Sequence, residues 1–382
     1  MKKLFFLFQI LTITFLSSCE KKELTVRFST FNSALNRPEK GMLIKDLQSG
    51  SVQAQNVASI IQEVNPDVLC IQEFDYDAKG VGLRLFMKEY LEKGDKAVHY
   101  PYFMMFPSNT GVLSESDINK DNKLSLPQDG YGFGAFEGQY AFVILSKYPI
   151  DKDAVRTFQY FKWKQMPNPN WPVLEDGSQW FNDTEKEDLR ISSKNHVDVP
   201  IKINNHVIHA IIAHPTPPVF DGEEDRNGKR NYDEIRLIKD YVEHKSYMVD
   251  DKGTKGGLKP NASFVIMGDM NADPVDGDSF DSAIVSLLQS ETLNSEVAVG
   301  DKIPFSKGAT EYNKTFKWSH KGPDNQDTNV FGLRIDYVLP SADLIVLETS
   351  VFWKEKSDAL GVLTFGKNAS DHRLVWSDVV LK

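Results

Sequence analysis

Ser263-Phe264-Val265-Ile266-Met267-Gly268-Asp269-Met270-Asn271-Ala272-Asp273-Pro274 is the stretch that decides the fold, because an apolar run passes directly into polar residues. The run from Phe264 to Gly268 has the length and the composition of a buried strand. Asp269 and Asn271 follow it at once, so this strand brings a carboxylate and an amide to one edge of a sheet. A sheet edge that gathers polar side chains in this way is typical of a functional site.

Further strands and helices are predicted along the chain on both sides of this stretch. Runs with the pattern of strands are Leu24 to Phe31, Asp67 to Gln72, Ala141 to Ser146, Val197 to Ile203, Val207 to Ala213, Leu333 to Leu339 and Arg373 to Leu381. Apolar residues recur at helical spacing within residues 57–64, 83–91, 235–242 and 284–288. The long polar stretches 107–138, 151–190, 215–232, 250–262 and 295–332 are interpreted as insertions, which at this length are more often functional than accidental.

Polar side chains follow the same kind of apolar run at several further points. These endings are Asn32, Gln72 with Glu73, His214, Asp269 with Asn271, Asp336, and Asp371 with His372. A single acid after a strand is ordinarily a solvated turn residue. Six such endings in one chain indicate that the strand ends meet in a common site.

These motifs resemble those of the endonuclease/exonuclease/phosphatase superfamily, of the deoxyribonuclease I type. The resemblance runs from about Thr25 to the C-terminus and rests on Phe31-Asn32, Gln72-Glu73, His214, Gly268-Asp269-Met270-Asn271, Ile335-Asp336-Tyr337-Val338 and Ser370-Asp371-His372. It implies an α/β fold, a four-layer sandwich of two packed mixed sheets with helices outside and a site at one end. It also implies metal-dependent hydrolysis of phosphate mono- or diesters.

The resemblance implies a divalent cation at this site. Glu73, helped by Asn32, is expected to hold Mg²⁺, with Mn²⁺ or Ca²⁺ as alternatives, because carboxylate and amide oxygens suit a hard cation. Asp371 corresponds to a further carboxylate of the metal or phosphate site.

The remaining motif residues are expected to carry the chemistry. His372 is expected to act as the general base, with its tautomer set by Asp336. Asn271 is expected to bind a phosphate oxygen, and Asp269 to position water or a second ion. His214 stands where nucleases and lipid or inositol phosphatases of this fold carry a histidine with a general-acid role. The glutamate that deoxyribonuclease-like members place near the strand at 139–142 is absent here.

Basic side chains near the strand that leads to His214 are candidates for phosphate contact. The resemblance favours Lys194, followed by Arg190 and His196, and ordinary surface charge is the alternative interpretation. The loop 220–230 follows the His214 strand and contributes Arg226 and Arg230. These cations either clamp a second anionic group of the substrate or belong to a solvated turn.

Oxygen-bearing side chains alternate at Asp117, Asn119 and Asp121, which resembles a calcium-binding loop. Position twelve of that loop is Gln128 where a bidentate glutamate is usual, so a polar surface loop is the alternative.

The amino terminus predicts export. Lys2 and Lys3 precede an apolar run that ends in Leu16-Ser17-Ser18-Cys19, a sequence similar to a bacterial lipobox. Residues 1–18 are then a lipoprotein signal peptide, 19–24 a tether lipidated at Cys19, and 25–382 a single domain. An ordinary signal peptide is the alternative. The other cysteine, Cys70, has the surroundings of a small buried hydrophobe.

The net charge of the chain restricts the class of substrate that is expected. The net charge is −10, and removal of residues 1–18 takes away two lysines and no acid, which leaves −12. Such a surface disfavours long polyanions, including nucleic acid. The prediction is an exported, membrane-anchored, monomeric phosphoesterase acting on a phosphorylated small molecule or lipid. The alternatives are an extracellular nuclease of the same fold and a binding lipoprotein without activity.

Overall fold

The computed structural model describes residues 23–315 and 320–381, in which the strands form two mixed sheets. The first sheet has the order β10 Ile345–Val351, β11 Val375–Leu381, β1 Leu24–Asn32, β2 Val68–Gln72, β4 Phe142–Ser146 and β3 Tyr102–Met105. The second has the order β5 Arg156–Thr157, β6 His196–Ile203, β7 His206–Ala213, β8 Ser263–Asp269 and β9 Asp336–Pro340. The predicted lipidation at Cys19 lies outside the described residues.

Short helices connect these strands. The α-helices are α1 Met42–Ser49, α2 Val52–Val64, α3 Val81–Phe86, α4 Asp183–Asp188, α5 Arg226–Val242, α6 Ala283–Leu288, α7 Ser295–Ala298, α8 Lys307–Asn313 and α9 Val362–Phe365. A π-helical turn at Met87–Leu91 continues α3. Across the described ranges, none of these helices combines the length and the apolar character needed to cross a bilayer.

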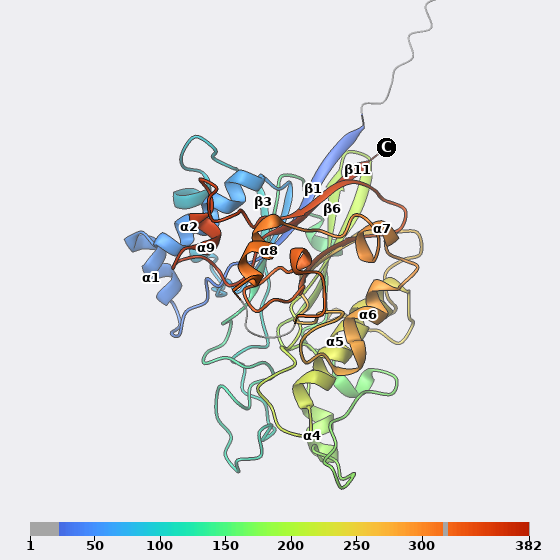
Figure 1. Cartoon of the computed structure of the whole chain (residues 1–382). Coiled ribbons are helices and arrows are strands. Elements are labelled where there is room, and N and C mark those ends of the chain that lie inside the picture. The colour runs from blue at the N-terminus through green and yellow to red at the C-terminus, as the bar shows by residue number, and fades with distance from the viewer. Residues whose placement is uncertain (1–22, 316–319, 382) are drawn as a thin grey trace, which may run out of the picture.

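Alternate residues of each strand face opposite sides of its sheet, and this creates three apolar cores between four layers. Phe28 of β1 and Val265 of β8 meet in the central core between the two sheets. Leu69 of β2 faces the other way and packs with α1 and α2, whereas Ile266 of β8 packs with α5 and α6. Figure 1 shows these two helix pairs on opposite sides of the strands. The predicted four-layer sandwich is confirmed.

The register of the strands brings distant parts of the chain to one end of the sandwich. β1 runs parallel to β2, and β7 runs parallel to β8, so their carboxyl ends coincide. β9 and β11 begin at this end because each is antiparallel to its neighbour. The paired residues nearest this end are Asn32 with Gln72, Thr30 with Val375, Asp269 with Asp336, and His196 with Ala213. Every predicted strand ending therefore reaches the same region.

The strands that the sequence pattern missed all lie at sheet edges. β3, β5 and β10 each pair with a neighbour on one side alone, and β10 leaves Ile345 and Leu347 exposed. An edge strand is half-covered and short, so it lacks the apolar run of a central strand. A second difference concerns the predicted insertion 215–232, because α5 already begins at Arg226.

Candidate active site

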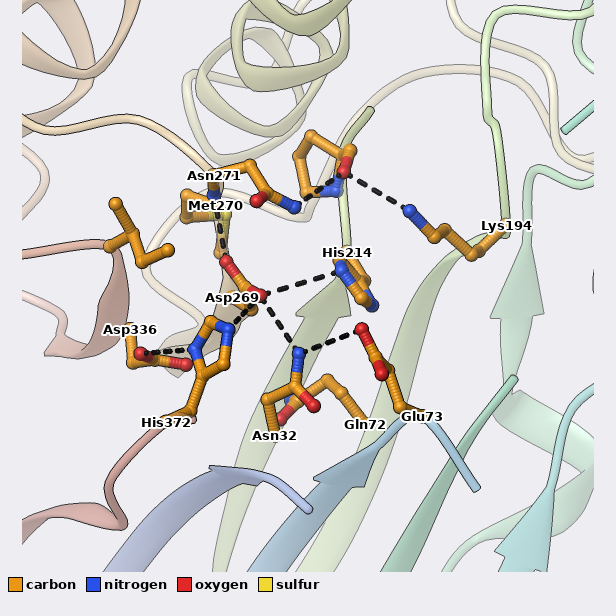
Figure 2. Close-up of polar contacts among 12 residues, drawn as sticks. Asn32, Gln72, Glu73, Lys194, His214, Asp269, Met270, Asn271, Asp336 and His372 are labelled. Atoms are coloured by element: carbon orange, nitrogen blue, oxygen red, sulfur yellow. Dashed lines mark hydrogen bonds and ion pairs between the residues drawn. The ribbon is translucent and has the colours of Figure 1, made fainter. Parts of the chain in front are cut away.

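A carboxylate, an imidazole and a second carboxylate form a line at the strand ends, joined by one hydrogen bond and one longer ion pair (Figure 2). Oδ2 of Asp336 lies 2.9 Å from Nδ1 of His372, and Nε2 of His372 lies 3.7 Å from Oδ2 of Asp269. All three side chains are buried. Thr328 donates to Oδ2 of Asp336 at 2.7 Å and so fixes the carboxylate that orients the imidazole. This is the His372–Asp336 pairing that the resemblance implied.

Charge controls the protonation of this line. Burial alone would lower the pKa of His372, but Asp336, Asp269 and Asp371 together raise it well above its ordinary value. Burial raises the pKa of Asp269 to about 6, with a further contribution from Asp336 and an opposing one from His372. A neighbouring cation would lower both values. His372 and Asp269 are therefore coupled, and a proton bound between them belongs to the pair.

Glu73 lies across the site from His372, between two amides. Asn32 donates from Nδ2 to Oε1 of Glu73 at 3.1 Å and to Oδ2 of Asp269 at 3.0 Å, and thereby bridges the two carboxylates. Asn36 donates to Oε2 of Glu73 at 2.7 Å. Burial raises the pKa of Glu73, and Asp371 and Asp269 raise it further. The Asn32 oxygen accepts from the amide of Ala34, so metal ligation by Asn32 stays a prediction.

The donor set fits a divalent cation. Glu73, Asp269, Asp336 and Asp371 bring four carboxylates together, and none of them forms an ion pair with lysine or arginine in residues 23–315 or 320–381. One oxygen of Asp336 is buried without a hydrogen-bond partner. Asp269, Asp336 and His372 place ligand atoms within 4.8 Å of one another. Hard oxygen donors with excess negative charge favour Mg²⁺, Mn²⁺ or Ca²⁺.

Unusual backbone conformations turn these side chains into the site. Glu73 and Asn271 have left-handed backbone, with φ of 56° and 50°. Such a conformation costs a residue with a side chain about 1–2 kcal/mol, and it recurs at functional sites. Gly268 is required by close packing, because a Cβ there would lie 2.0 Å from the carbonyl oxygen of Ala213. The glycine of the Gly-Asp-x-Asn motif is thus explained by the contact between β7 and β8.

Lys194 and Asn271 meet on one carbonyl beside His214. The Pro215 oxygen accepts from Nζ of Lys194 at 3.3 Å and from Nδ2 of Asn271 at 3.1 Å (Figure 2). Burial lowers the pKa of Lys194, whereas Glu234, Glu73 and Asp269 oppose the shift. A buried ammonium without a carboxylate contact suits an incoming anion. Phosphate contact by Lys194 stays a prediction, and this geometry is compatible with it.

His214 is held as a neutral imidazole. Burial lowers its pKa well below the ordinary value, and the charges of Lys194 and His372 lower it further. Nε2 lies 3.5 Å from Oδ2 of Asp269, and Nδ1 is buried without a partner. A neutral His214 carries no spare proton for the leaving group near neutral pH, so this arrangement favours hydrogen bonding over the expected general-acid role.

Loss of the Lys194 charge is expected to weaken substrate binding. A hydrogen bond to a charged group contributes about 1.5–3 kcal/mol, so Lys194→Met should raise KM about 10- to 100-fold. Steady-state kinetics on a phosphoester measures this. Lys202→Met in β6, the strand that follows Lys194, is the control, because Lys202 pairs with Asp151 on the exposed surface and its loss should leave KM unchanged. An unchanged KM in Lys194→Met would contradict the assignment.

Two of the predicted phosphate contacts, those of His196 and Arg230, involve side chains that already form hydrogen bonds inside the protein, so their contact with a phosphate stays a prediction. His196 uses Nδ1 with the Ser192 hydroxyl at 2.6 Å and Nε2 with the Glu234 carbonyl at 3.1 Å. Arg230 donates to the carbonyls of Ile191, Arg190 and Tyr131. His196 thereby joins β6 to helix α5, and Arg230 joins α5 to the segments around residues 131 and 190.

Arg190 and Arg226 are also held by protein contacts. The guanidinium of Arg190 lies 4.0 Å from the ring centre of Tyr131 and donates to Asn109 at 2.6 Å. Arg226 pairs with Glu224 in the first turn of α5. Their contact with a phosphate stays a prediction.

The resemblance of residues 117–128 to a calcium loop also remains untested. Side-chain oxygens of Asp117, Asn119 and Asp121 accept hydrogen bonds from backbone amides at positions 121–123. These contacts are those of Asx turns, which stabilise a loop without an ion. They support the alternative of a polar surface loop.

Four buried or half-buried polar residues around the site were missed from the sequence: Asn36, Thr328, Asn231 and Glu234. A signal existed for the last two, because Asn231 and Glu234 fall on the same helical face as the predicted apolar residues Ile235 and Ile238. A polar residue aligned with an apolar stripe is buried and must find partners.

Known proteins share this arrangement. The model of the Endonuclease/Exonuclease/phosphatase family matches residues 30–372. A solved endonuclease/exonuclease/phosphatase from Beutenbergia cavernae is 17% identical, with 94% of this chain and 72% of that chain covered and a TM-score of 0.52. Sphingomyelinase C from Streptomyces griseocarneus is 15% identical, with 93% and 99% covered and a TM-score of 0.47. Truncated Caenorhabditis elegans TDP2 is 14% identical, with 94% and 98% covered and a TM-score of 0.44. No curated protein sequence matches the chain.

The family match spans most of the chain and includes every strand ending from Asn32 to His372. The B. cavernae structure supports the same fold. The chain therefore belongs to the endonuclease/exonuclease/phosphatase family, whose members are hydrolases acting on phosphoester bonds.

Proposed function

We propose that the protein is an exported, lipid-anchored phosphoesterase that depends on a divalent metal ion and cleaves a small or lipid-derived phosphorylated substrate. The observation that carries the proposal is the line from Asp336 through His372 to Asp269, with Glu73 on one side and Lys194 on the other. It joins a proton acceptor, a metal-binding carboxylate and an anion-binding ammonium in one buried site.

The residues support an in-line attack by water on phosphorus. Lys194 and the second amide hydrogen of Asn271 bind phosphate oxygens beside Pro215. The His372–Asp269 pair accepts the proton of the attacking water, with Asp336 keeping the imidazole oriented. A new P–O bond forms as the ester P–O bond breaks, and the leaving oxygen departs on the opposite side. A cation held by Glu73 and Asp371, Mg²⁺ in our proposal, would supply positive charge that stabilises the pentacoordinate phosphorus.

A small substrate is supported by charge and by the insertions. The net charge of −10 repels long polyanions, which disfavours a nuclease role. The backbone amide of Asn109 donates to the carbonyl of Lys194 at 2.9 Å, so the insertion 107–138 lies beside the proposed phosphate contact and supports a site that takes a small substrate. A monomer acting alone is sufficient, because every site residue comes from one chain.

A substrate panel tests the proposal. The form with residues 20–382 is assayed with p-nitrophenyl phosphate, its bis ester, DNA, sphingomyelin and inositol phosphates, each with Mg²⁺, Mn²⁺, Ca²⁺ or EDTA. Hydrolysis of a small or lipid substrate that EDTA abolishes is the expected result. Preference for DNA would establish the nuclease alternative. Metal-independent hydrolysis, or no hydrolysis of any substrate, would overturn the proposal.

The predicted lipid anchor at Cys19 would place the protein at a membrane. β1 starts at Leu24 and reaches the site at Asn32, and nine strand residues span roughly 30 Å. A tether at Cys19 would therefore attach to the end of the sandwich opposite the site, which would leave the site open to water. Cys19→Ala should move the protein from the membrane fraction to the soluble fraction, whereas Cys70→Ala should not, because Cys70 is buried in β2. Membrane retention of Cys19→Ala would contradict lipidation.

A further inference from the structure

Asn231 and Glu234 are fully buried polar side chains of helix α5 that lie one turn apart. Both have an exposed fraction of 0%, and neither forms an ion pair within the described residues. A buried carboxylate is costly unless it accepts several hydrogen bonds. Their partners lie outside the helix, on the chain segments that carry the site.

Glu234 holds two of these segments. One oxygen accepts from the amide of Ser193 at 2.7 Å and from its hydroxyl at 3.0 Å, directly before Lys194. The other oxygen accepts from the amide of Thr216 at 2.6 Å. The Thr216 amide and the Pro215 carbonyl belong to one planar trans peptide, so they point in opposite directions. Glu234 therefore fixes, from behind, the carbonyl on which Lys194 and Asn271 meet.

Asn231 acts on a second peptide in the same way. Its Nδ2 donates to the carbonyl of Met270 at 2.9 Å and to that of Thr216 at 2.8 Å. The Met270 carbonyl shares a peptide plane with the amide of Asn271, which donates to Oδ1 of Asp269 at 2.9 Å on the opposite side. Figure 2 shows Met270 between these two site residues. Asn231 thus fixes the peptide that links Asp269 to the left-handed Asn271.

We propose that Asn231 and Glu234 are positioning residues, which set the orientation of peptides 270–271 and 215–216 and thereby place Asn271, Asp269 and Lys194 for the reaction. The effect of these two residues on catalysis rests on the proposed function. Neither side chain is assigned a contact with substrate. Their effect reaches the phosphate through the two peptides, so a small rotation of either peptide moves the phosphate-binding groups together.

Nearly isosteric substitutions test this without opening a cavity. Glu234→Gln turns one acceptor oxygen into an NH₂ group that faces a backbone amide, and Asn231→Asp turns the donor into an oxygen that faces two carbonyls. Each variant, made in the full chain, should lower kcat/KM about 10- to 100-fold, the loss that a misplaced catalytic group causes. In the Lys194→Met background, Glu234→Gln should have a smaller effect, because part of its action is already removed.

The matched control is Asp233→Asn on the same helix. Asp233 also has an exposed fraction of 0%, but it accepts from Trp163 and Asn170 in the insertion and pairs with Arg236 on its own helix, and within residues 23–315 and 320–381 it has no hydrogen bond to a strand end. Its substitution should lower the melting temperature as much as Glu234→Gln does and leave kcat/KM unchanged. A purely structural role for Glu234 would instead give the two variants the same kinetics at equal stability.

A second measurement remains decisive if the wild-type chain hydrolyses no tested phosphoester, in which case the proposed function fails by itself. Crystal structures of Glu234→Gln and Asn231→Asp should show peptide 215–216 or 270–271 rotated, with Lys194 or Asn271 displaced. Unchanged peptides in both variants would overturn the positioning role, whatever the activity. Full kcat/KM in both variants of an active enzyme would overturn it as well.

Discussion

His372→Ala is expected to lower the turnover number about 10²- to 10⁴-fold, the range that a positioned acid–base group contributes. The substitution removes the imidazole that joins Asp336 to Asp269, so the attacking water loses its proton acceptor. KM should change little, because Lys194 and Asn271 still bind the phosphate. Steady-state kinetics on the best substrate of the panel, with circular dichroism to confirm folding, measures this.

The matched control for His372 is another histidine that is paired with an aspartate. His209 in β7 lies 2.8 Å from an oxygen of Asp198, which reproduces the pairing away from the strand ends. His209→Ala should keep the turnover of the wild type. The turnover number of Asp269→Asn should fall as far as that of His372→Ala, since the two groups accept one proton together. Near-normal turnover in His372→Ala would refute the mechanism, and full activity in Asp269→Asn would restrict the base to His372.

Glu73→Gln is expected to raise the metal concentration required for half-maximal activity at least about 100-fold. Changes outside the first ligand sphere already cost about 10- to 100-fold in metal affinity, and Glu73 is the proposed ligand itself. The amide keeps the shape of the side chain but loses the charge that offsets the cation. Activity titrated with Mg²⁺, together with calorimetric titration of the metal, measures the shift.

Two further variants serve as comparisons for the loss of metal affinity in Glu73→Gln. Asn36→Ala removes a hydrogen bond of 2.7 Å to Oε2 of Glu73 and should give an intermediate loss of metal affinity. Glu63→Gln changes a carboxylate that pairs with the exposed Lys96 and should leave the metal titration unchanged. If Glu73→Gln binds metal as tightly as the wild type does, the cation is held elsewhere in the site.

Central strands were predictable because they are buried on both faces. An apolar run such as Phe264 to Gly268 is required wherever a strand packs between two layers, and the polar residues after it mark the sheet edge. The family motifs were visible for the same reason, since each stands where such a run begins or stops. Edge strands such as β3 and β10 were not predicted, because a strand that is exposed on one side does not need an apolar run.

The buried polar residues around the site were less predictable than the motif residues. The phosphate contacts of His196 and Arg230 were predicted from their positions in the sequence alone. In the structure both side chains form hydrogen bonds to protein carbonyls, and His196 also bonds a hydroxyl. Thr328 was overlooked because nothing local shows that its hydroxyl meets Asp336. A hydrogen-bonding side chain looks the same in a sequence whether its partner is water or a distant backbone group.

The amino-acid sequence was enough to predict the central strands from local apolar runs and the polar residues that end them, and the resemblance of its motifs was enough to predict the layered α/β sandwich and the family. Only the tertiary structure decided which polar groups face one another. Helix α5 illustrates the reason. The role of Asn231 and Glu234 depends on their hydrogen-bond partners. These partners are Met270, Thr216 and Ser193, which the fold brings to the helix from elsewhere in the chain. Strand formation depends on near neighbours in the sequence, whereas a buried hydrogen bond depends on where the whole fold places its two partners.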